Sequence, residues 1–210
     1  MLKTRIAVLV SGGGTNLQAL IDAQKRGELQ SGEISVVVST KPGVLALSRA
    51  ENAGIRNAVV CRKDCADQAE FESRLLSILQ DAQIEMIVLA GFMSILSADF
   101  IAHYEDRIIN VHPSLIPSFC GKGFYGLRVH EAALRYGVKI TGATVHFVNA
   151  VPDGGKIILQ KAVEIRPDDS PESLQRRVME QAEWVLLPQA TQMLAEGIMK
   201  QKEQGNEQHL

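Results

Sequence analysis

The stretch Arg107-Ile108-Ile109-Asn110-Val111-His112-Pro113 places two polar side chains at the end of an apolar run. On a β-strand, positions i and i+2 face the same side, so Asn110 and His112 are expected to point together into one site. Pro113 has no N–H to donate and is expected to end the strand. An amide beside an imidazole at an abrupt strand end is typical of an active site in an open α/β sheet.

Apolar runs alternate with amphipathic segments before this stretch. The alternation predicts an α/β fold with a mostly parallel sheet covered by helices on both faces. The expected strands are 6–10, 34–38, 58–60, 86–90 and 107–111, and the expected helices are 17–25, 44–53, 69–81 and 97–103.

The C-terminal half follows a different pattern. A short helix over 130–136 is expected to precede two strands, 142–147 and 156–163, which are predicted to be antiparallel neighbours across a turn at 151–155. A long helix is expected from Pro171 to Gly197, with Ser170 as its cap and Pro171 in its first turn.

The composition is that of an ordinary globular protein, with 46% hydrophobic and 22% charged residues. We expect one domain over residues 1–198, followed by a polar, disordered tail over 199–210. The formal net charge is −2, so no basic surface indicates a nucleic-acid partner.

No secretory or membrane-spanning pattern is expected from the N-terminal apolar run, which is short. Cys61, Cys65 and Cys120 match no standard zinc framework and are expected to be free thiols, although Cys61 and Cys65 have a spacing that would allow chelation. The sequence therefore predicts a cytoplasmic protein with no metal and no membrane partner.

A glycine-rich segment, Ser11-Gly12-Gly13-Gly14-Thr15-Asn16, follows the first expected strand and opens the first expected helix. Glycines let backbone N–H groups approach a ligand, and a helix N-terminus suits a phosphate. The spacing matches neither the dinucleotide-binding fingerprint nor the P-loop. From the glycines alone, a tight turn without a ligand fits equally well.

Four motifs in this chain resemble those of the folate-dependent formyltransferase family. The run from Asn110 to Pro117 is similar to the signature Asn-x-His-Pro-Ser-Leu-Leu-Pro, and 144–148 followed by 152–155 is similar to a second signature. Residues 11–17 and 90–96 resemble the phosphate loop and the folate-pocket segment of the branch that acts on glycinamide ribonucleotide. The resemblance covers nearly the whole chain and implies a single-domain, Rossmann-like formyltransferase fold.

The resemblance also implies a reaction: the formyl group of 10-formyltetrahydrofolate, a co-substrate, passes to the amine of 5-phosphoribosylglycinamide in purine biosynthesis. Such a transfer forms a tetrahedral intermediate with a negative oxygen, so the site needs a hydrogen-bond donor and a route for protons. Asn110 and His112 are the expected donors. Asp153 is expected to raise the pKa of the histidine and to relay a proton. This chemistry requires neither a metal nor a covalent intermediate.

The resemblance assigns two groups of binding residues. Gly14, Thr15 and Asn16 are implied to hold the ribonucleotide phosphate, and Glu183 its amine end; from the sequence alone, Glu183 equally fits an exposed helix position. The implied folate-binding residues are Met93, Ser94, Ile95, Leu96, Asn110, Asn149, Ala150, Val151, Pro152 and Asp153. Many members carry arginine at the position of Ser94, and some near Gln68. From the sequence alone, the 91–96 run also fits plain core.

Two further features lead to expectations of their own. His146 lies within an expected strand and is predicted to be a core histidine with a satisfied hydrogen bond. Residues 118–130 combine glycines with aromatic residues, which favours a mobile flap over the site, with a solvated loop as the alternative. Within it, Lys122 and Arg128 are candidates for holding phosphate.

Other function classes fit less well. Methionyl-tRNA formyltransferases and formyltetrahydrofolate deformylases resemble this core but carry an additional domain, which we do not expect here. A non-catalytic nucleotide-binding module would not need the set of Asn110, His112 and Asp153, although fold alone would not separate these classes. The expected partners are small-molecule substrates, and a monomer and a homodimer are both compatible with the sequence.

Overall fold

The computed structural model describes residues 3–207, and the side chains of residues 3–204. Within this range seven strands form one sheet in the order β3-β2-β1-β4-β5-β6-β7. The strands are β1 (Thr4–Val10), β2 (Gly32–Ser39), β3 (Arg56–Val59), β4 (Met86–Leu89), β5 (Ile108–His112), β6 (Ile140–Phe147) and β7 (Ile157–Glu164). Pairing is parallel from β3 to β5 and antiparallel from β5 to β7. This arrangement confirms the predicted fold class.

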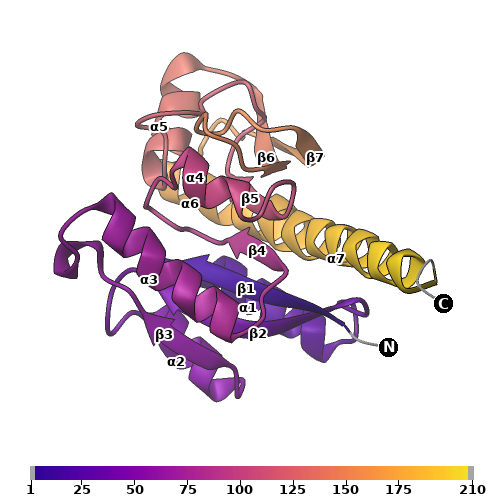
Figure 1. Ribbon diagram of the computed structural model, residues 1–210. Helices are drawn as coiled ribbons and strands as arrows, with labels where there is room; N and C mark the ends of the chain where they lie inside the picture. Colours follow the sequence, from indigo (N-terminus) through magenta and orange to yellow (C-terminus); the bar gives the residue numbers. More distant parts are fainter. Residues whose placement is uncertain (1–2, 208–210) are drawn as a thin grey trace.

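Helices cover both faces of the sheet (Figure 1). They are α1 (Thr15–Lys25), α2 (Leu45–Asn52), α3 (Gln68–Asp81), α4 (Ala98–Ala102), α5 (Leu127–Tyr136), α6 (Pro171–Val178) and α7 (Trp184–Glu207), with a 3₁₀ turn at Arg62–Asp64 and a π-helical turn at Met179–Glu183. Helices α1, α2, α6 and α7 pack on one face, and α3 and α4 pack on the other. Among the described helices, none is both long enough and apolar enough to cross a membrane.

The central strands are apolar throughout because each contributes to two cores. In β1, Ile6, Val8 and Val10 pack toward α1 and α7, whereas Ala7 and Leu9 pack toward α3. Successive side chains of a strand point to opposite faces, so a strand covered on both sides has no polar face. The continuous apolar runs that predicted these strands follow from this two-sided burial.

The C-terminal helices begin as predicted but end later. The Ser170 side chain accepts a hydrogen bond from the backbone N–H of Ser173, and Pro171 starts α6. After the π-helical turn, α7 continues to Glu207 rather than ending at Gly197, so residues 199–207, expected to form a disordered tail, are helical. Residues 208–210 lie outside the described part of the chain.

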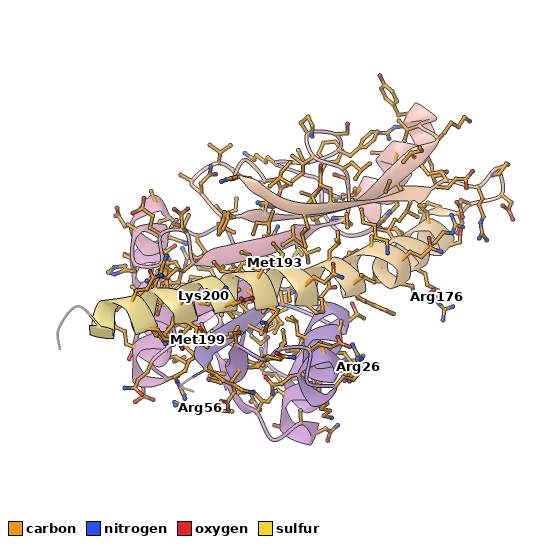
Figure 2. All side chains as sticks on the ribbon, turned by 90° about the vertical axis from the view of Figure 1, so that its right-hand side faces the viewer. Arg26, Arg56, Arg176, Met193, Met199 and Lys200 are labelled. Carbon is orange, nitrogen blue, oxygen red and sulfur yellow. The ribbon has the colours of Figure 1, made fainter. Side chains whose placement is uncertain are left out.

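Contacts along α7 explain this correction. Ile198 is buried, Lys200 Nζ lies 2.6 Å from Glu196 Oε1, and Lys202 forms an ion pair with Glu85. Figure 2 shows α7 lying across the molecule, with Met193 and Lys200 along its outer side. The polar composition of the tail does not reveal such partners, because Glu85 is distant in sequence.

The order of the strands reverses between β1 and β4: β2 and β3 follow on one side of β1, and β4 to β7 follow on the other side. The Ser11 hydroxyl, directly after β1, is 2.7 Å from the Thr40 hydroxyl and accepts a hydrogen bond of 3.0 Å from the Met93 N–H. In open α/β sheets, ligands bind in the crevice at such a switch point. The hydrogen bonds of Ser11 therefore join three loops at the edge where a site is expected.

Candidate active site

Asn110 and His112 project from the end of β5, at the border between the parallel and antiparallel parts of the sheet. In the β5–β6 ladder, Asn110 lies opposite His146, and His112 lies opposite Thr144. Both Asn110 and His112 line one cavity, as their i, i+2 spacing predicts. The pairing of β5 with β6 thus brings the His146 imidazole beside the Asn110 amide.

Asp153 reaches the same place from the loop between β6 and β7. Its Oδ2 lies 3.5 Å from His112 Nδ1 and accepts a hydrogen bond of 2.8 Å from the Gly121 N–H. The backbone of Asp153 has a φ of +56°, which few non-glycine residues adopt. A Cβ on Gly155 would lie 1.7 Å from the Phe147 carbonyl oxygen. This close backbone packing explains one glycine of the Asp-Gly-Gly motif.

The two histidines are held in defined orientations by backbone carbonyls. His112 Nε2 is 2.9 Å from the Phe119 oxygen, and His146 Nδ1 is 2.8 Å from the Phe147 oxygen. Because a carbonyl only accepts, we assign a proton to each of these nitrogens. The proton that His112 gains or loses is then on Nδ1, the nitrogen that faces Asp153.

His146 belongs to the site, which corrects the expectation of a plain core histidine. The ring is buried and hydrogen-bonded, as predicted, but its Nε2 is 3.2 Å from Asn110 Nδ2 and 3.5 Å from Asp153 Oδ1. In its neutral form Nε2 accepts from the Asn110 amide. His146 therefore orients the amide and borders the carboxylate at once.

Burial and charge act in opposite directions on the pKa values of the site. Burial lowers the pKa of His112, while the Asp153 carboxylate and the Phe119 carbonyl partly offset this effect. Burial raises the pKa of Asp153, but the nearby imidazoles of His146 and His112 and the hydrogen bond from the Gly121 N–H outweigh it and leave the pKa below its usual value. The carboxylate is thus ionised near neutral pH beside a histidine that loses its charge readily.

Two adjoining cavities meet at these residues. The smaller, about 130 Å³, is lined by Leu89, Phe92, Val148 and all predicted folate-binding residues except Met93. The larger, about 580 Å³, is lined by Asn16, Met93, His112, Lys122 and Glu183, among others. Asn110 and Asp153 line both cavities. The combined space has the size of a small-molecule site, with the polar groups between its two parts.

Two backbone groups of the segment after β4 are already hydrogen-bonded within the protein. The Met93 N–H donates to Ser11, and the Ile95 carbonyl accepts a hydrogen bond of 3.0 Å from Gln68 Nε2. Gln68, where some relatives place arginine, also donates to the buried Glu72, at 2.6 Å. Its side chain therefore fixes the loop from within, and the exposed Met93 and Ile95 side chains form the cavity wall.

The glycine-rich loop opens α1 as predicted, but only part of it reaches the larger cavity. Asn16 lines this cavity, whereas Gly14 and Thr15 are not part of its wall. Gly14 has a φ of +72°, and a Cβ there would lie 2.7 Å from the Ala46 Cβ of α2. The close approach of α2 therefore requires this glycine, independently of any ligand.

Glu183 is buried, which excludes an exposed helix position. It lies in the π-helical turn, and Asn16 Nδ2 donates a hydrogen bond of 2.6 Å to its Oε2. Burial raises the pKa of Glu183 to about 7, with the Asn16 hydrogen bond opposing the shift. The structure thus joins two predicted substrate-binding residues that are 167 positions apart in the chain.

Residues 118–130 are anchored to the site rather than forming a simple solvated loop. Their last four residues belong to α5, which begins at Leu127 rather than at His130. Lys122 lines the larger cavity, and the Arg128 guanidinium lies 4.9 Å from the centre of the Tyr125 ring. His130 is buried at the cavity wall, and neither ring nitrogen has a hydrogen-bond partner among the described residues. Its burial, which lowers its pKa to about 4, was not evident from the sequence.

The three cysteines are free thiols in the structure, as predicted. Cys61 and Cys65 are buried, and the Cys65 thiol donates to the Cys61 carbonyl. Among the residues that the structure describes, no group of three or more His, Cys, Asp and Glu side chains could hold a metal ion.

Comparisons with known proteins agree with this geometry. Residues 4–191 match the model of the formyl transferase family. The trifunctional purine biosynthetic protein adenosine-3 of Gallus gallus is 44% identical over 203 residues, which are 97% of this chain but 20% of that protein. The chain thus spans a fifth or less of the trifunctional relatives.

Two other relatives are matched over most of their length. The phosphoribosylglycinamide formyltransferase of Haemophilus influenzae is 39% identical over 199 residues, which are 95% of this chain and 91% of that protein. The crystal structure of glycinamide ribonucleotide transformylase 1 from Symbiobacterium toebii has a TM-score of 0.87 and 37% identity, covering 93% of this chain and 89% of that one. On the family match and these relatives, the chain belongs to the formyl transferase family.

Proposed function

We propose that this protein transfers the formyl group of 10-formyltetrahydrofolate to the amine of 5-phosphoribosylglycinamide. The observation that carries the proposal is the position of Asn110, His112 and Asp153 where two cavities adjoin. A transfer between two small molecules needs its reactive groups at the place where the ligands meet. The names of relatives matched over about nine tenths of their length support formyl transfer to this ribonucleotide.

The reaction joins the amine nitrogen to the formyl carbon and places a negative charge on the formyl oxygen. The bond from this carbon to the folate nitrogen then breaks, and a proton from the amine moves to that nitrogen. One N–H of Asn110 Nδ2 donates to His146, and we assign its second N–H to the developing oxyanion. The neutral amide can do this without changing its charge.

His112 and Asp153 supply the second part of the chemistry. The protonated imidazole carries a proton on Nδ1, 3.5 Å from Asp153 Oδ2. We assign to this pair the stabilisation of the oxyanion by positive charge and the relay of the proton from amine to folate. The Gly121 N–H holds the carboxylate in place at 2.8 Å.

The two cavities divide the ligands. The smaller one, bounded by Leu96, Val148 and the 149–153 loop, fits the flat pterin of the folate. The larger one, with Asn16, Lys122 and Glu183, fits the ribonucleotide. The Glu183 carboxyl, next to Asn16, is suited to a hydrogen bond with the substrate amine. The first turn of α1 and Lys122 are suited to its phosphate.

One assay tests the proposal. Purified protein is incubated with 10-formyltetrahydrofolate, with and without glycinamide ribonucleotide, and tetrahydrofolate formation is followed. Formation that depends on the ribonucleotide supports the proposal. Formation without the ribonucleotide indicates a hydrolase that removes the formyl group as formate. Binding of both ligands without any turnover indicates a binding module, and either of these two results contradicts the proposal.

A further inference from the structure

The segment Phe119-Cys120-Gly121 contacts two catalytic groups that come from different parts of the fold. The Phe119 carbonyl accepts from His112 Nε2 at 2.9 Å, and the Gly121 N–H donates to Asp153 Oδ2 at 2.8 Å. His112 ends β5, whereas Asp153 lies in the loop between β6 and β7. Three consecutive residues of a third segment therefore tie the imidazole to the carboxylate through backbone groups alone.

The backbone of this segment is held in an unusual conformation. Phe119 has a φ of +49°, although it is not glycine, and Gly121 has a φ of +85°. An L-residue with a side chain rarely adopts the left-handed region unless its surroundings impose it. The position of the Phe119 carbonyl therefore needs an explanation from the contacts of its side chain.

Aromatic contacts provide this explanation. The centre of the Phe119 ring lies 6.4 Å from that of Phe124 and 5.9 Å from that of Tyr136, with interplanar angles of 62° and 74°. Edge-to-face pairs at these distances are favourable. Phe124 follows the segment in the same loop before α5, whereas Tyr136 ends α5. The half-buried Phe119 ring thus contacts its own loop on one side and the largely exposed Tyr136 at a helix end on the other.

We propose that Phe119 is a positioning residue for His112: its ring, packed on Phe124 and Tyr136, holds its carbonyl on His112 Nε2, so that the exchangeable proton is on Nδ1 beside Asp153. This inference rests on the proposed function and deepens it. It gives Phe119, which lines neither cavity, a role in orienting His112 without contact to either substrate.

The Phe119 hydrogen bond affects the pKa of His112 in a definite direction. The Phe119 carbonyl and the Asp153 carboxylate raise the pKa of His112, whereas burial and the His146 imidazole lower it. Other titratable groups near this site are His130, whose pKa is about 4, and Cys120, whose pKa burial raises, and both are neutral at pH 7. Lys122 and Glu183 line the same cavity, but the hydrogen-bond partner of His112 Nε2 is the Phe119 carbonyl. Loss of the Phe119 hydrogen bond is therefore expected to lower the pKa of His112.

The experiment compares variants by ¹⁵N NMR of the histidine rings, with the His112 signals identified by their absence in His112→Gln. In the parent protein, neutral His112 is expected to carry its proton on Nε2. Phe119→Gly accepts the positive φ but lacks the ring, so a purely conformational role predicts parent-like spectra. Our proposal predicts instead a mixture of tautomers, a lower titration midpoint and a loss of kcat of about tenfold to a hundredfold, with smaller changes in KM.

Conservative variants separate positioning from folding. Phe119→Tyr and Tyr136→Phe keep the rings and are expected to retain the His112 tautomer. Tyr136→Ala removes one ring contact and is expected to shift the tautomer in the same direction as Phe119→Gly. If Phe119→Gly fails to fold by circular dichroism, the Tyr136→Ala spectrum decides the question.

The result that overturns the inference is a folded Phe119→Gly or Tyr136→Ala protein whose His112 keeps the parent tautomer and titration midpoint. The NMR measurement needs no turnover. A parent protein without formyl transfer would therefore contradict the proposed function, while the tautomer would still decide whether Phe119 positions His112.

Discussion

The glycine-rich loop after β1 and the polar end of β5 lie at the same edge of the sheet, yet the fold accounts for them differently. In the loop, Gly14 is required by the close approach of Ala46, whatever binds nearby. In β5, Asn110 and His112 occupy strand positions whose backbone pairing with β6 does not depend on their polar side chains. Both motifs resemble the same family. The packing of the fold explains Gly14 of the loop, but it does not explain why Asn110 and His112 are polar.

The difference teaches how to interpret a substitution in each region. A side chain at Gly14 disturbs the packing against Ala46 whether or not a ligand binds. A change at Asn110 or His112 removes a side chain that we propose to act in the reaction, and the surrounding strands are expected to remain paired. Stability measurements and rate measurements should therefore separate the two regions, and the following predictions are designed to test this separation.

The largest effect is expected for His112→Ala and Asn110→Ala. The first removes a positive charge and the second a hydrogen-bond donor, each proposed to stabilise charge that develops only in the transition state, and loss of such a donor lowers kcat by about 10²–10³ in other enzymes. Steady-state kinetics gives kcat, and calorimetry is expected to show nearly unchanged nucleotide binding. His103→Ala, at an exposed position of the surface between α3 and α4, serves as the control. Near-parental kcat in either variant would contradict the assignment of the oxyanion site.

Glu183 is connected to both regions. It accepts a hydrogen bond from Asn16 of the glycine-rich loop, and it lines the same cavity as Asn110 and His112. Its pKa is raised from 4.5 in the unfolded chain to about 7 in the folded protein. A carboxyl with a raised folded pKa stabilises the fold fully below pH 4.5 and loses this contribution as pH rises through 7. The total loss corresponds to about 3 kcal/mol, since one pKa unit is about 1.4 kcal/mol.

Glu183→Gln removes this titration. Urea unfolding at pH 5 and pH 8 is expected to show that the free energy of unfolding falls less for the variant than for the parent protein. Glu131→Gln, at an exposed position in α5, should behave like the parent. Equal pH dependence of Glu183→Gln and the parent would mean that Glu183 titrates as an ordinary carboxyl.

Asp153→Asn tests the coupling between the polar end of β5 and the loop between β6 and β7. The carboxylate raises the pKa of His112, so its removal is expected to lower this pKa, and the limb of the pH–rate profile due to His112 should move to lower pH. Loss of the proton relay is expected to reduce kcat by about 10². NMR titration of His112 in both proteins measures the shift. An unchanged pKa would leave Asp153 without its electrostatic role.

The fold was largely predictable from the sequence because local patterns determine it. The apolar runs of β1 and β4 and the cap at Ser170 depend on neighbours in the chain. The i, i+2 spacing of Asn110 and His112, followed by Pro113, was likewise sufficient to bring both side chains to one cavity. These predictions needed no knowledge of distant contacts.

Other parts of the site depend on contacts that a local pattern does not contain. His146 joins the site because the antiparallel register places it opposite Asn110. Glu183 is turned inward in a π-helical turn, which changes the angular position of the following residues relative to a regular α-helix. The left-handed backbone of Phe119 is equally invisible in the sequence, because glycine would be the expected residue there.

The smallest effect, and the sharpest test of the comparison, is expected within the glycine-rich loop itself. A Cβ at Gly14 meets the Ala46 Cβ at 2.7 Å and is strained by the φ of +72°, whereas a Cβ at Gly13 meets nothing within 4 Å. Gly14→Ala is therefore expected to lower the free energy of unfolding by about 1–2 kcal/mol. Gly13→Ala should change it by less than about 0.5 kcal/mol.

Ligand binding by the same pair then distinguishes packing from recognition. If the bare backbone of the loop holds the phosphate, the added methyl of Gly13→Ala should weaken binding of glycinamide ribonucleotide without loss of stability, and folate binding should be unaffected. Urea unfolding and calorimetry with each ligand separately measure these quantities. Normal nucleotide binding by Gly13→Ala, together with a destabilised Gly14→Ala, would show that the loop is a turn demanded by α2 and that the phosphate binds elsewhere, with Lys122 as the next position to test.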